Sequence, residues 1–186
     1  MEYPTYVLAA DIGGTKIASA IIYYEKEGVK PTILNLETIA TKASLGGDVV
    51  LDRLASICAK QIQYAASHNI NLVGIGIDTA GCVDADSGSI LYANEIMPGW
   101  TGQKIAERLE GDYNLPVAVM GDVHGHAQGE ARWGAAKGLH SALVVAAGTG
   151  IGGAYVLEGK VVRGAHGASC HLGHSLTPAS NFECTW

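Results

Sequence analysis

Residues 6–28 read YVLAADIGGTKIASAIIYYEKEG, and this stretch decides the fold. β-Branched and aromatic residues on both sides of DIGGTK (11–16) favour two strands, Tyr6–Ala10 and Ile17–Tyr24. Glycines in such a turn let backbone N–H groups point into one concavity, and no Cβ blocks an approaching ligand. The stretch therefore predicts a glycine turn between strands that can hold an anion, with an ordinary tight turn as the alternative.

The same pattern recurs at residues 142–162, ALVVAAGTGIGGAYVLEGKVV, where GTGIGG (148–153) separates two strand-like runs. GTGIGG has the spacing G-x-G-x-x-G, but a dinucleotide site also needs a helix after the turn and an acidic residue about 20 positions later. Here a strand pattern follows, and no acidic residue lies between Glu158 and Glu183. No Gly-Lys-Ser/Thr follows either turn, so a Walker A loop is excluded as well.

Two glycine hairpins that face each other could instead hold a polyphosphate between two domains. The first of them carries Asp11, Thr15 and Lys16. Asp11 is suited to bind, directly or through water, the Mg²⁺ that accompanies the phosphates.

Composition narrows the class of protein. Hydrophobic residues make up 48% of the 186 residues and charged residues 16%, which is typical of a chain that forms a core. The net charge is −6 without a basic run, which argues against nucleic acid as the main ligand. No apolar run is long enough to span a membrane, the start lacks the features of a signal peptide, and four scattered cysteines suggest free thiols in the cytoplasm.

The middle of the chain alternates helix and strand patterns. Residues 47–69 have a helical period, LVGIGIDTAG (72–81) is a strand that ends in a glycine turn, and residues 102–113 return to a helix. LPVAVMGD (115–122) is a further strand, and a helix over 124–136 follows directly.

Asp122 therefore stands at the end of a strand and just before a helix, where α/β folds place their ligands. A carboxylate near a helix N-terminus is stabilised as an anion and can accept a proton from an attacking hydroxyl. The alternative is a helix N-cap, which the local sequence alone favours.

Six motifs in order resemble the ROK family of sugar kinases: DIGGTK (11–16), GIGIDTAGCVD (74–84), YANEIMPGW (92–100), GDVHGHAQGEARWGAA (121–136), GTGIGG (148–153) and GASCHLGH (167–174). The resemblance implies an α/β fold of the actin/hexokinase-like (ribonuclease H-like) type, with two domains and mixed sheets. Residues 1–118 would form the smaller domain with the first phosphate loop. Residues 119–186 would begin the larger domain, which would be incomplete in a fragment of this length.

The resemblance also implies roles for individual residues. Asp122 matches the catalytic base, which takes the proton of a sugar hydroxyl as the hydroxyl attacks the γ-phosphate of ATP. The residues that match the two phosphate loops are Asp11, Gly13, Gly14, Thr15 and Lys16, and Gly148, Thr149, Gly150, Gly152 and Gly153. The residues that match the sugar site are Gly81, Asn94, Gly121, Asp122, His171 and His174.

Three positions depart from the family pattern. Gly121 replaces the asparagine that usually precedes the catalytic aspartate and binds a sugar hydroxyl. His171 replaces the sugar-binding glutamate of the E-x-G-H motif, and replacement of such an acceptor predicts changed sugar selectivity. His174 and Cys184 match only half of the family's zinc ligands, and a structural zinc site needs four, so we expect no structural zinc.

These observations predict an ATP- and Mg²⁺-dependent kinase that phosphorylates a hexose or N-acetylhexosamine in the cytoplasm. By family analogy it would form a homodimer, with a small sugar as its partner and neither nucleic acid nor membrane. Two alternatives remain open: a catalytically impaired sugar- or nucleotide-binding protein, and a sugar-responsive regulator. Only ten residues precede Asp11, which leaves no room there for the helix-turn-helix of the family's regulators.

Overall fold

The computed structural model describes residues 2–148 and 150–175, and it divides into two compact units, residues 1–122 and 123–186. The first unit contains β1 (Thr5–Ile12), β2 (Lys16–Tyr24), β3 (Thr32–Ala40), the short helix η1 (Ala43–Leu45), α1 (Gly47–Ser67), β4 (Leu72–Thr79), β5 (Cys82–Asp84), β6 (Ser89–Tyr92), α2 (Ile105–Tyr113) and β7 (Val117–Gly121). The helix α3 (Asp122–Trp133) begins at the boundary, and β8 (Ser141–Ala147), β9 (Ile151–Leu157), β10 (Lys160–Val162) and the short helix η2 (Leu172–His174) follow it.

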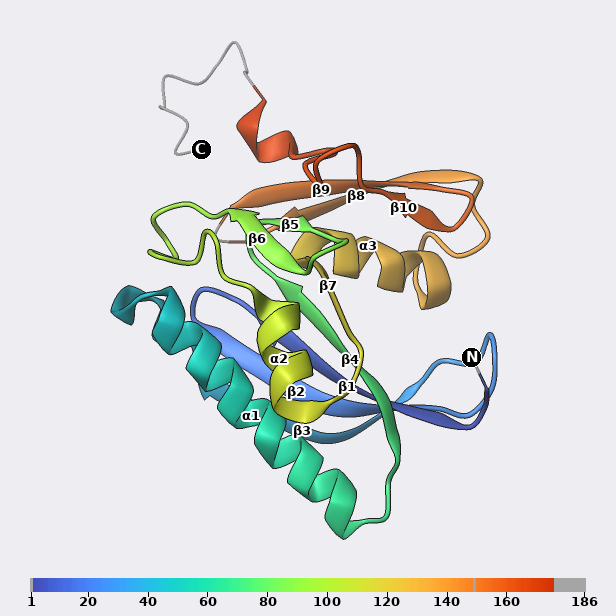
Figure 1. Ribbon diagram of the computed structural model, residues 1–186. Helices are drawn as coiled ribbons and strands as arrows, with labels where there is room; N and C mark the ends of the chain where they lie inside the picture. Colours follow the sequence, from blue (N-terminus) through green and yellow to red (C-terminus); the bar gives the residue numbers. More distant parts are fainter. Residues whose placement is uncertain (1, 149, 176–186) are drawn as a thin grey trace. The chain divides into compact units, whose positions relative to one another are not determined.

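A five-stranded sheet in the order β3-β2-β1-β4-β7 forms the centre of the first unit (Figure 1). β1, β2 and β3 form an antiparallel meander, in which Ile12 is paired with Ile17 across the first glycine turn. β4 pairs in parallel with β1 and with β7. The mixed sheet matches the expected fold class, and the parallel strands β1, β4 and β7 all end at the same edge.

The helices α1 and α2 lie on one side of this sheet and cover its core (Figure 1). In β1, Leu8, Ala10 and Ile12 are buried, whereas Ala9 is partly exposed and Asp11 is exposed. The helical period predicted over residues 47–69 corresponds to α1, whose buried stripe includes Leu54, Ile57 and Cys58. Hydrophobic burial on this side accordingly holds the unit together.

Gln61 is a fully buried polar residue of α1 that fastens an irregular part of the sheet. The pairing of β2 with β3 shifts register between Ser19 and Ile21, and Asn35 on β3 has a positive φ of 49°. The side chain of Gln61 donates to the backbone oxygens of Ser19 at 3.1 Å and Asn35 at 2.8 Å, and it accepts from Asn35 Nδ2 at 3.1 Å. Its amide therefore satisfies the backbone groups that the irregularity leaves unpaired.

We predict that Gln61→Leu lowers the free energy of unfolding by about 2–4 kcal/mol, because buried carbonyls lose their donors. Urea denaturation followed by circular dichroism measures the change. Gln63→Leu, at an exposed position on the same helix, is the control and should change stability by less than about 1 kcal/mol. Equal losses in both variants would contradict this assignment.

The second unit contains an antiparallel sheet in the order β10-β9-β8, and α3 packs on it. Small side chains make the contact close: Ala127 and Ala131 of α3 lie against Ala154 and Val156 of β9. The predicted strands at 142–147, 154–157 and 160–162 are all present, and β9 extends back to Ile151.

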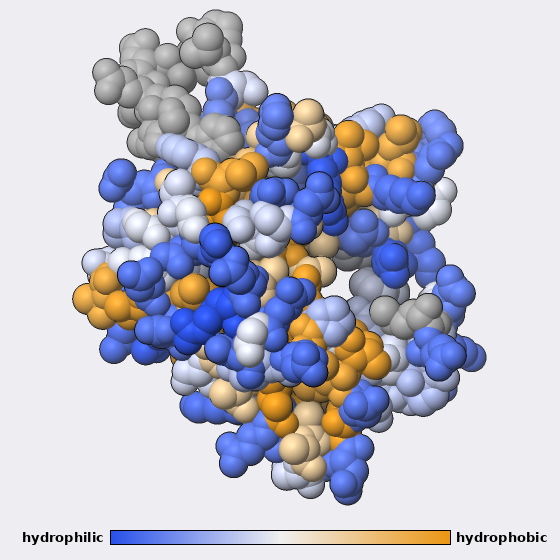
Figure 2. Space-filling view, in the orientation of Figure 1, coloured by the Kyte–Doolittle hydropathy of each residue, from blue (hydrophilic) through white to orange (hydrophobic). Residues whose placement is uncertain are grey.

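Some boundaries differ from the sequence expectation. α2 begins at Ile105 rather than Gly102, and α3 begins at Asp122 and ends at Trp133, whereas residues 124–136 were expected. β3 was not anticipated, because its sequence TILNLETIA does not alternate cleanly and is only partly buried. None of the helices in the described part of the chain is long and apolar enough to cross a membrane. Orange patches in Figure 2 show that apolar side chains also reach the surface.

Candidate functional site

The carboxyl ends of β1, β4 and β7 bring aspartates together in the first unit. Asp11 is paired in register with Asp78 on β4, and Asp78 is paired with Met120 on β7. Gly121 ends β7, and Asp122 follows as the first residue of α3. An exposed Asp11, a half-buried Asp78 and Asp122 at a helix N-terminus therefore share one edge of the sheet.

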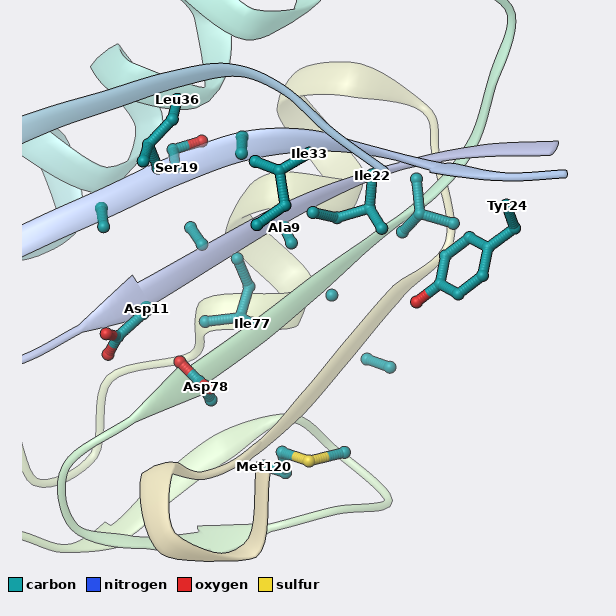
Figure 3. A pocket seen from close by; sticks show the side chains of 16 residues that line it. Ala9, Asp11, Ser19, Ile22, Tyr24, Ile33, Leu36, Ile77, Asp78 and Met120 are labelled. Carbon is teal, nitrogen blue, oxygen red and sulfur yellow. The ribbon is translucent and has the colours of Figure 1, made fainter. Parts of the chain in front are cut away.

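Asp78 is the most perturbed of these groups. Burial raises its pKa to about 8, and the neighbouring carboxylates of Asp11 and Asp122 add to the rise. Its Oδ1 atom is buried and has no hydrogen-bond partner among the described residues, while the carboxyl group forms a hydrogen bond with Asp11. Asp11 and Asp78 line an open cavity of about 420 Å³ whose other lining is mostly apolar, with Ser19 and Tyr24 as polar exceptions. Figure 3 shows the two aspartates near each other at one end of it. Apolar surroundings and like charges both disfavour ionisation, so Asp78 holds a proton at neutral pH.

Asp11 is the aspartate of this edge that could hold a metal ion, since its carboxylate is exposed. Within residues 2–148 and 150–175, no three His, Cys, Asp or Glu side chains are placed to hold a metal ion. Mg²⁺ prefers oxygen ligands and is usually held by one or two carboxylates together with substrate phosphates. The exposed carboxylate of Asp11 fits that pattern.

The first glycine turn is ordered by a buried threonine. Thr41 Oγ1 donates to the Gly13 carbonyl at 2.6 Å, and its N–H donates to the Thr15 carbonyl at 2.9 Å. The Gly13 N–H is bonded across the turn to the Lys16 carbonyl at 3.0 Å. Gly14 packs closely on the loop at 92–100, because a Cβ there would lie 3.2 Å from Ile96 Cγ2. The turn is a fixed feature next to Asp11.

Gly81 and Asn94 have structural roles that the sequence did not indicate. Gly81 has a φ of 102°, and a Cβ would lie 2.7 Å from the Tyr92 carbonyl, so the turn after β4 requires glycine. Asn94 Oδ1 accepts from the Ile96 N–H at 3.2 Å and shapes the 92–100 loop. The buried Trp100 at the end of this loop donates from Nε1 to Thr79 Oγ1 at 3.1 Å. The loop is thereby tied to the end of β4 beside Asp78.

The second glycine turn joins β8 and β9 in the second unit, where the Gly148 N–H donates to the Gly150 carbonyl at 2.9 Å. Cβ atoms at Gly148 or Gly150 would meet nothing within 4 Å, so both positions leave open space for a ligand. Gly152 and Gly153 are different. A Cβ at Gly152 would lie 2.5 Å from Val123 Cγ2, and a Cβ at Gly153 would lie 2.6 Å from Leu172 Cδ1. These two glycines therefore permit close packing against Val123 and Leu172. Thr149 lies outside the described residues.

Histidines gather in the second unit as well. The ring of the buried His124 on α3 lies 6.4 Å from that of His171, and the rings of His171 and His174 lie 6.1 Å apart. His124 Nε2 is 3.4 Å from the Ser169 carbonyl, which links α3 to the loop before His171. The proposed partner of His174 in a zinc site, Cys184, lies outside the described residues.

The comparisons with known proteins agree with this architecture. The model of the ROK family matches residues 7–185. The chain belongs to the ROK family.

Named relatives of this ROK protein include sugar kinases. It is 34% identical over 173 residues to an uncharacterized protein of Clostridium perfringens (93% of this chain, 55% of the other). It is 29% identical over 180 residues to a glucokinase of Halalkalibacterium halodurans (96% and 52%). A ROK glucokinase from Streptomyces griseus, solved with glucose and AMPPNP, superimposes with a TM-score of 0.75 at 31% identity (91% and 50%). The chain thus spans about half the length of these relatives and has their actin/hexokinase-like α/β fold.

Two residues of interest escaped the sequence reasoning. Asp78 was read only as part of the motif GIGIDTAG, although strand alternation places it on the face opposite Ile75 and Ile77, in line with Asp11. His124 was predicted only as part of a helix. It lies two positions after Asp122 and therefore on a different side of α3. The strand parity of Asp78 was readable from the sequence, but the proximity of His124 to His171 required the fold.

The pKa of Asp78 is about 8 in the folded protein, whereas its unperturbed value is 3.8. At pH values between these two, the native state therefore binds up to one more proton than the unfolded state. The contribution of Asp78 to the free energy of unfolding therefore falls as pH rises, by up to about 1.4 kcal/mol per pH unit. We predict that Asp78→Asn removes this dependence and stabilises the protein relative to wild type at pH 8.5 but not at pH 4.5.

Urea denaturation at several pH values between 4.5 and 8.5 makes the measurement. Asp86→Asn is the matched control, since Asp86 is exposed. Parallel pH profiles for wild type and Asp78→Asn would show that Asp78 ionises normally and would refute the prediction.

Proposed function

We propose that the protein is an ATP-dependent kinase, or the part of one, that phosphorylates a hydroxyl of a hexose or N-acetylhexosamine. The observation that carries the proposal is the position of Asp122, at the end of β7 and the start of α3, on the same sheet edge as Asp11. The named functions of relatives, among them glucokinases, support it.

Asp122 serves as the general base in this proposal. Its carboxylate accepts the proton of the sugar hydroxyl while the hydroxyl oxygen attacks the γ-phosphorus of ATP, and ADP departs as the leaving group. The N-terminus of α3 stabilises a negative charge on Asp122. Repulsion between like charges disfavours a further anion beside it. Asp78 fits that arrangement because it stays protonated and so adds no charge at neutral pH.

The glycine turns and Asp11 supply the phosphate side of the proposed reaction. Gly13, Gly14, Thr15 and Lys16 form the first phosphate loop, and the open positions Gly148 and Gly150 form the ligand-facing part of the second. Asp11 would hold Mg²⁺, which neutralises phosphate charge when bound. Gly152 and Gly153 contribute by letting β9 pack closely, rather than by touching phosphate.

The sugar side is assigned to the segments of Gly81 and Asn94, to Gly121, and to His171 and His174. Imidazole can donate a hydrogen bond where a glutamate only accepts, so His171 changes which sugar hydroxyl pattern is favoured. Gly121 carries no side chain, and a bulkier substituent such as an N-acetyl group has more room there. We place the reaction in the cytoplasm, where ATP is available, and a homodimer remains a prediction by family analogy.

A sugar- or nucleotide-binding protein without turnover is the second candidate, including a sugar-responsive regulator. The departures at Gly121 and His171 from the family's sugar-site pattern favour it. The two candidates differ in turnover and not in binding.

We predict that Asp122→Asn lowers the rate of sugar phosphorylation by about 10²–10⁴-fold, because the general base is removed, while the affinity for ATP stays within a few-fold. ADP release is measured with glucose, mannose, fructose, N-acetylglucosamine and N-acetylmannosamine, and sugar and AMPPNP binding are measured by calorimetry. Asp112→Asn, on the surface helix α2, is the control.

Each outcome decides one point. Full activity in Asp122→Asn would refute the base assignment. Binding of sugar or AMPPNP with no turnover for any sugar in the wild type would support the binding protein over the kinase for this chain.

A further inference from the structure

Ile96 is an apolar residue of the 92–100 loop that touches the first glycine turn. Its Cγ2 atom would lie only 3.2 Å from a Cβ placed on Gly14, which is closer than ordinary van der Waals contact. Gly14 does not have a positive φ, so its backbone conformation would accept an alanine. The close approach of Ile96, rather than the backbone conformation, is therefore what an alanine at this position would disturb.

The loop keeps the side chain of Ile96 outside the core. Met97 and Trp100 are buried and anchor the loop, whereas Ile96 is 55% exposed. Asn94 fixes the backbone of this segment, because its Oδ1 atom accepts from the Ile96 N–H at 3.2 Å and its carbonyl accepts from the Met97 N–H at 3.0 Å. Ile96 thus adds little to the core, while its backbone is held in place next to the turn.

The contact of Ile96 complements the hydrogen bonds of Thr41. Thr41 donates to the carbonyls of Gly13 and Thr15, the residues that flank Gly14. Ile96 contacts Gly14 itself. A β-branched side chain has a restricted χ1 angle, so an isoleucine is a stiff support even where it is exposed.

We propose that Ile96 is a positioning residue for the first phosphate loop. By supporting the turn at Gly14, it sets the path of the backbone that meets the phosphates of the nucleotide. Asn94 belongs to the proposed sugar side and fixes the backbone of Ile96, so the same contact joins the sugar segment to the phosphate loop. This role rests on the proposed function, in which the turn binds phosphate.

Conservative variants separate the contact from hydrophobicity and size. Ile96→Val keeps the Cγ2 branch that touches Gly14. Ile96→Leu keeps the number of carbon atoms but loses the branch at Cβ. Leu91→Val, at a position on β6 that is 48% exposed, is the matched control.

Binding of AMPPNP without sugar, measured by calorimetry, tests the role without any need for turnover. We expect Ile96→Leu to weaken AMPPNP binding by about tenfold, with Ile96→Val and Leu91→Val within about twofold of wild type. Sugar affinity and the midpoint of urea denaturation should stay close to wild type in all three variants, because the core is unchanged. Without ligand, the backbone amide NMR shifts of Gly13, Gly14 and Thr15 should move in Ile96→Leu and not in Ile96→Val.

Equal AMPPNP affinities of Ile96→Leu and Ile96→Val, or unchanged turn shifts in Ile96→Leu, would overturn the positioning role. A loss of sugar affinity alone in Ile96→Leu would also overturn it, because the side chain would then serve the sugar and not the turn. A wild type that does not bind AMPPNP would overturn it as well. AMPPNP binding without turnover for any sugar would count against the kinase alone, and the Ile96 variants would still decide the positioning role.

Discussion

The parallel direction of β1, β4 and β7 is the constraint on which the candidate site depends. Parallel neighbours end at the same edge of a sheet, so residues at the ends of three separate strand patterns meet there. Asp11 and Asp78 are directly paired, and Asp122 follows the last residue of β7. An antiparallel β4 would have separated Asp78 from Asp11 by the length of a strand.

This arrangement has an electrostatic cost that shapes the chemistry. Three carboxylates at one edge repel one another, and the half-buried one among them keeps its proton. Asp78 thereby relieves the repulsion while keeping a hydrogen bond to Asp11. The exposed Asp11 is then placed to bind a cation that accompanies phosphate. The start of α3 is a helix N-terminus, which favours an anion.

Local patterns were enough to predict most strands and helices, because the alternation around DIGGTK and GTGIGG and the helical stripe of α1 are strong. They failed for β3, where the backbone at its irregular register accepts a hydrogen bond from Gln61 of α1. Local patterns also could not distinguish the role of Gly150, which borders open space, from that of Gly153, which packs against Leu172. Glycine has the same appearance in a sequence whether a ligand or a neighbouring side chain needs the space. The resemblance to the ROK family correctly identified the family, whereas the roles of single site residues remain proposals.

The central claim is that the strand ends place Asp78 in an apolar, negatively charged environment next to Asp11. Carboxyl ¹³C chemical shifts of aspartate-labelled protein, followed by NMR from pH 3 to pH 9, test it most directly. We predict that the Asp78 carboxyl titrates near pH 8 in the wild type and clearly lower in Asp11→Asn. Titration near its unperturbed value of 3.8 in both proteins would contradict the account.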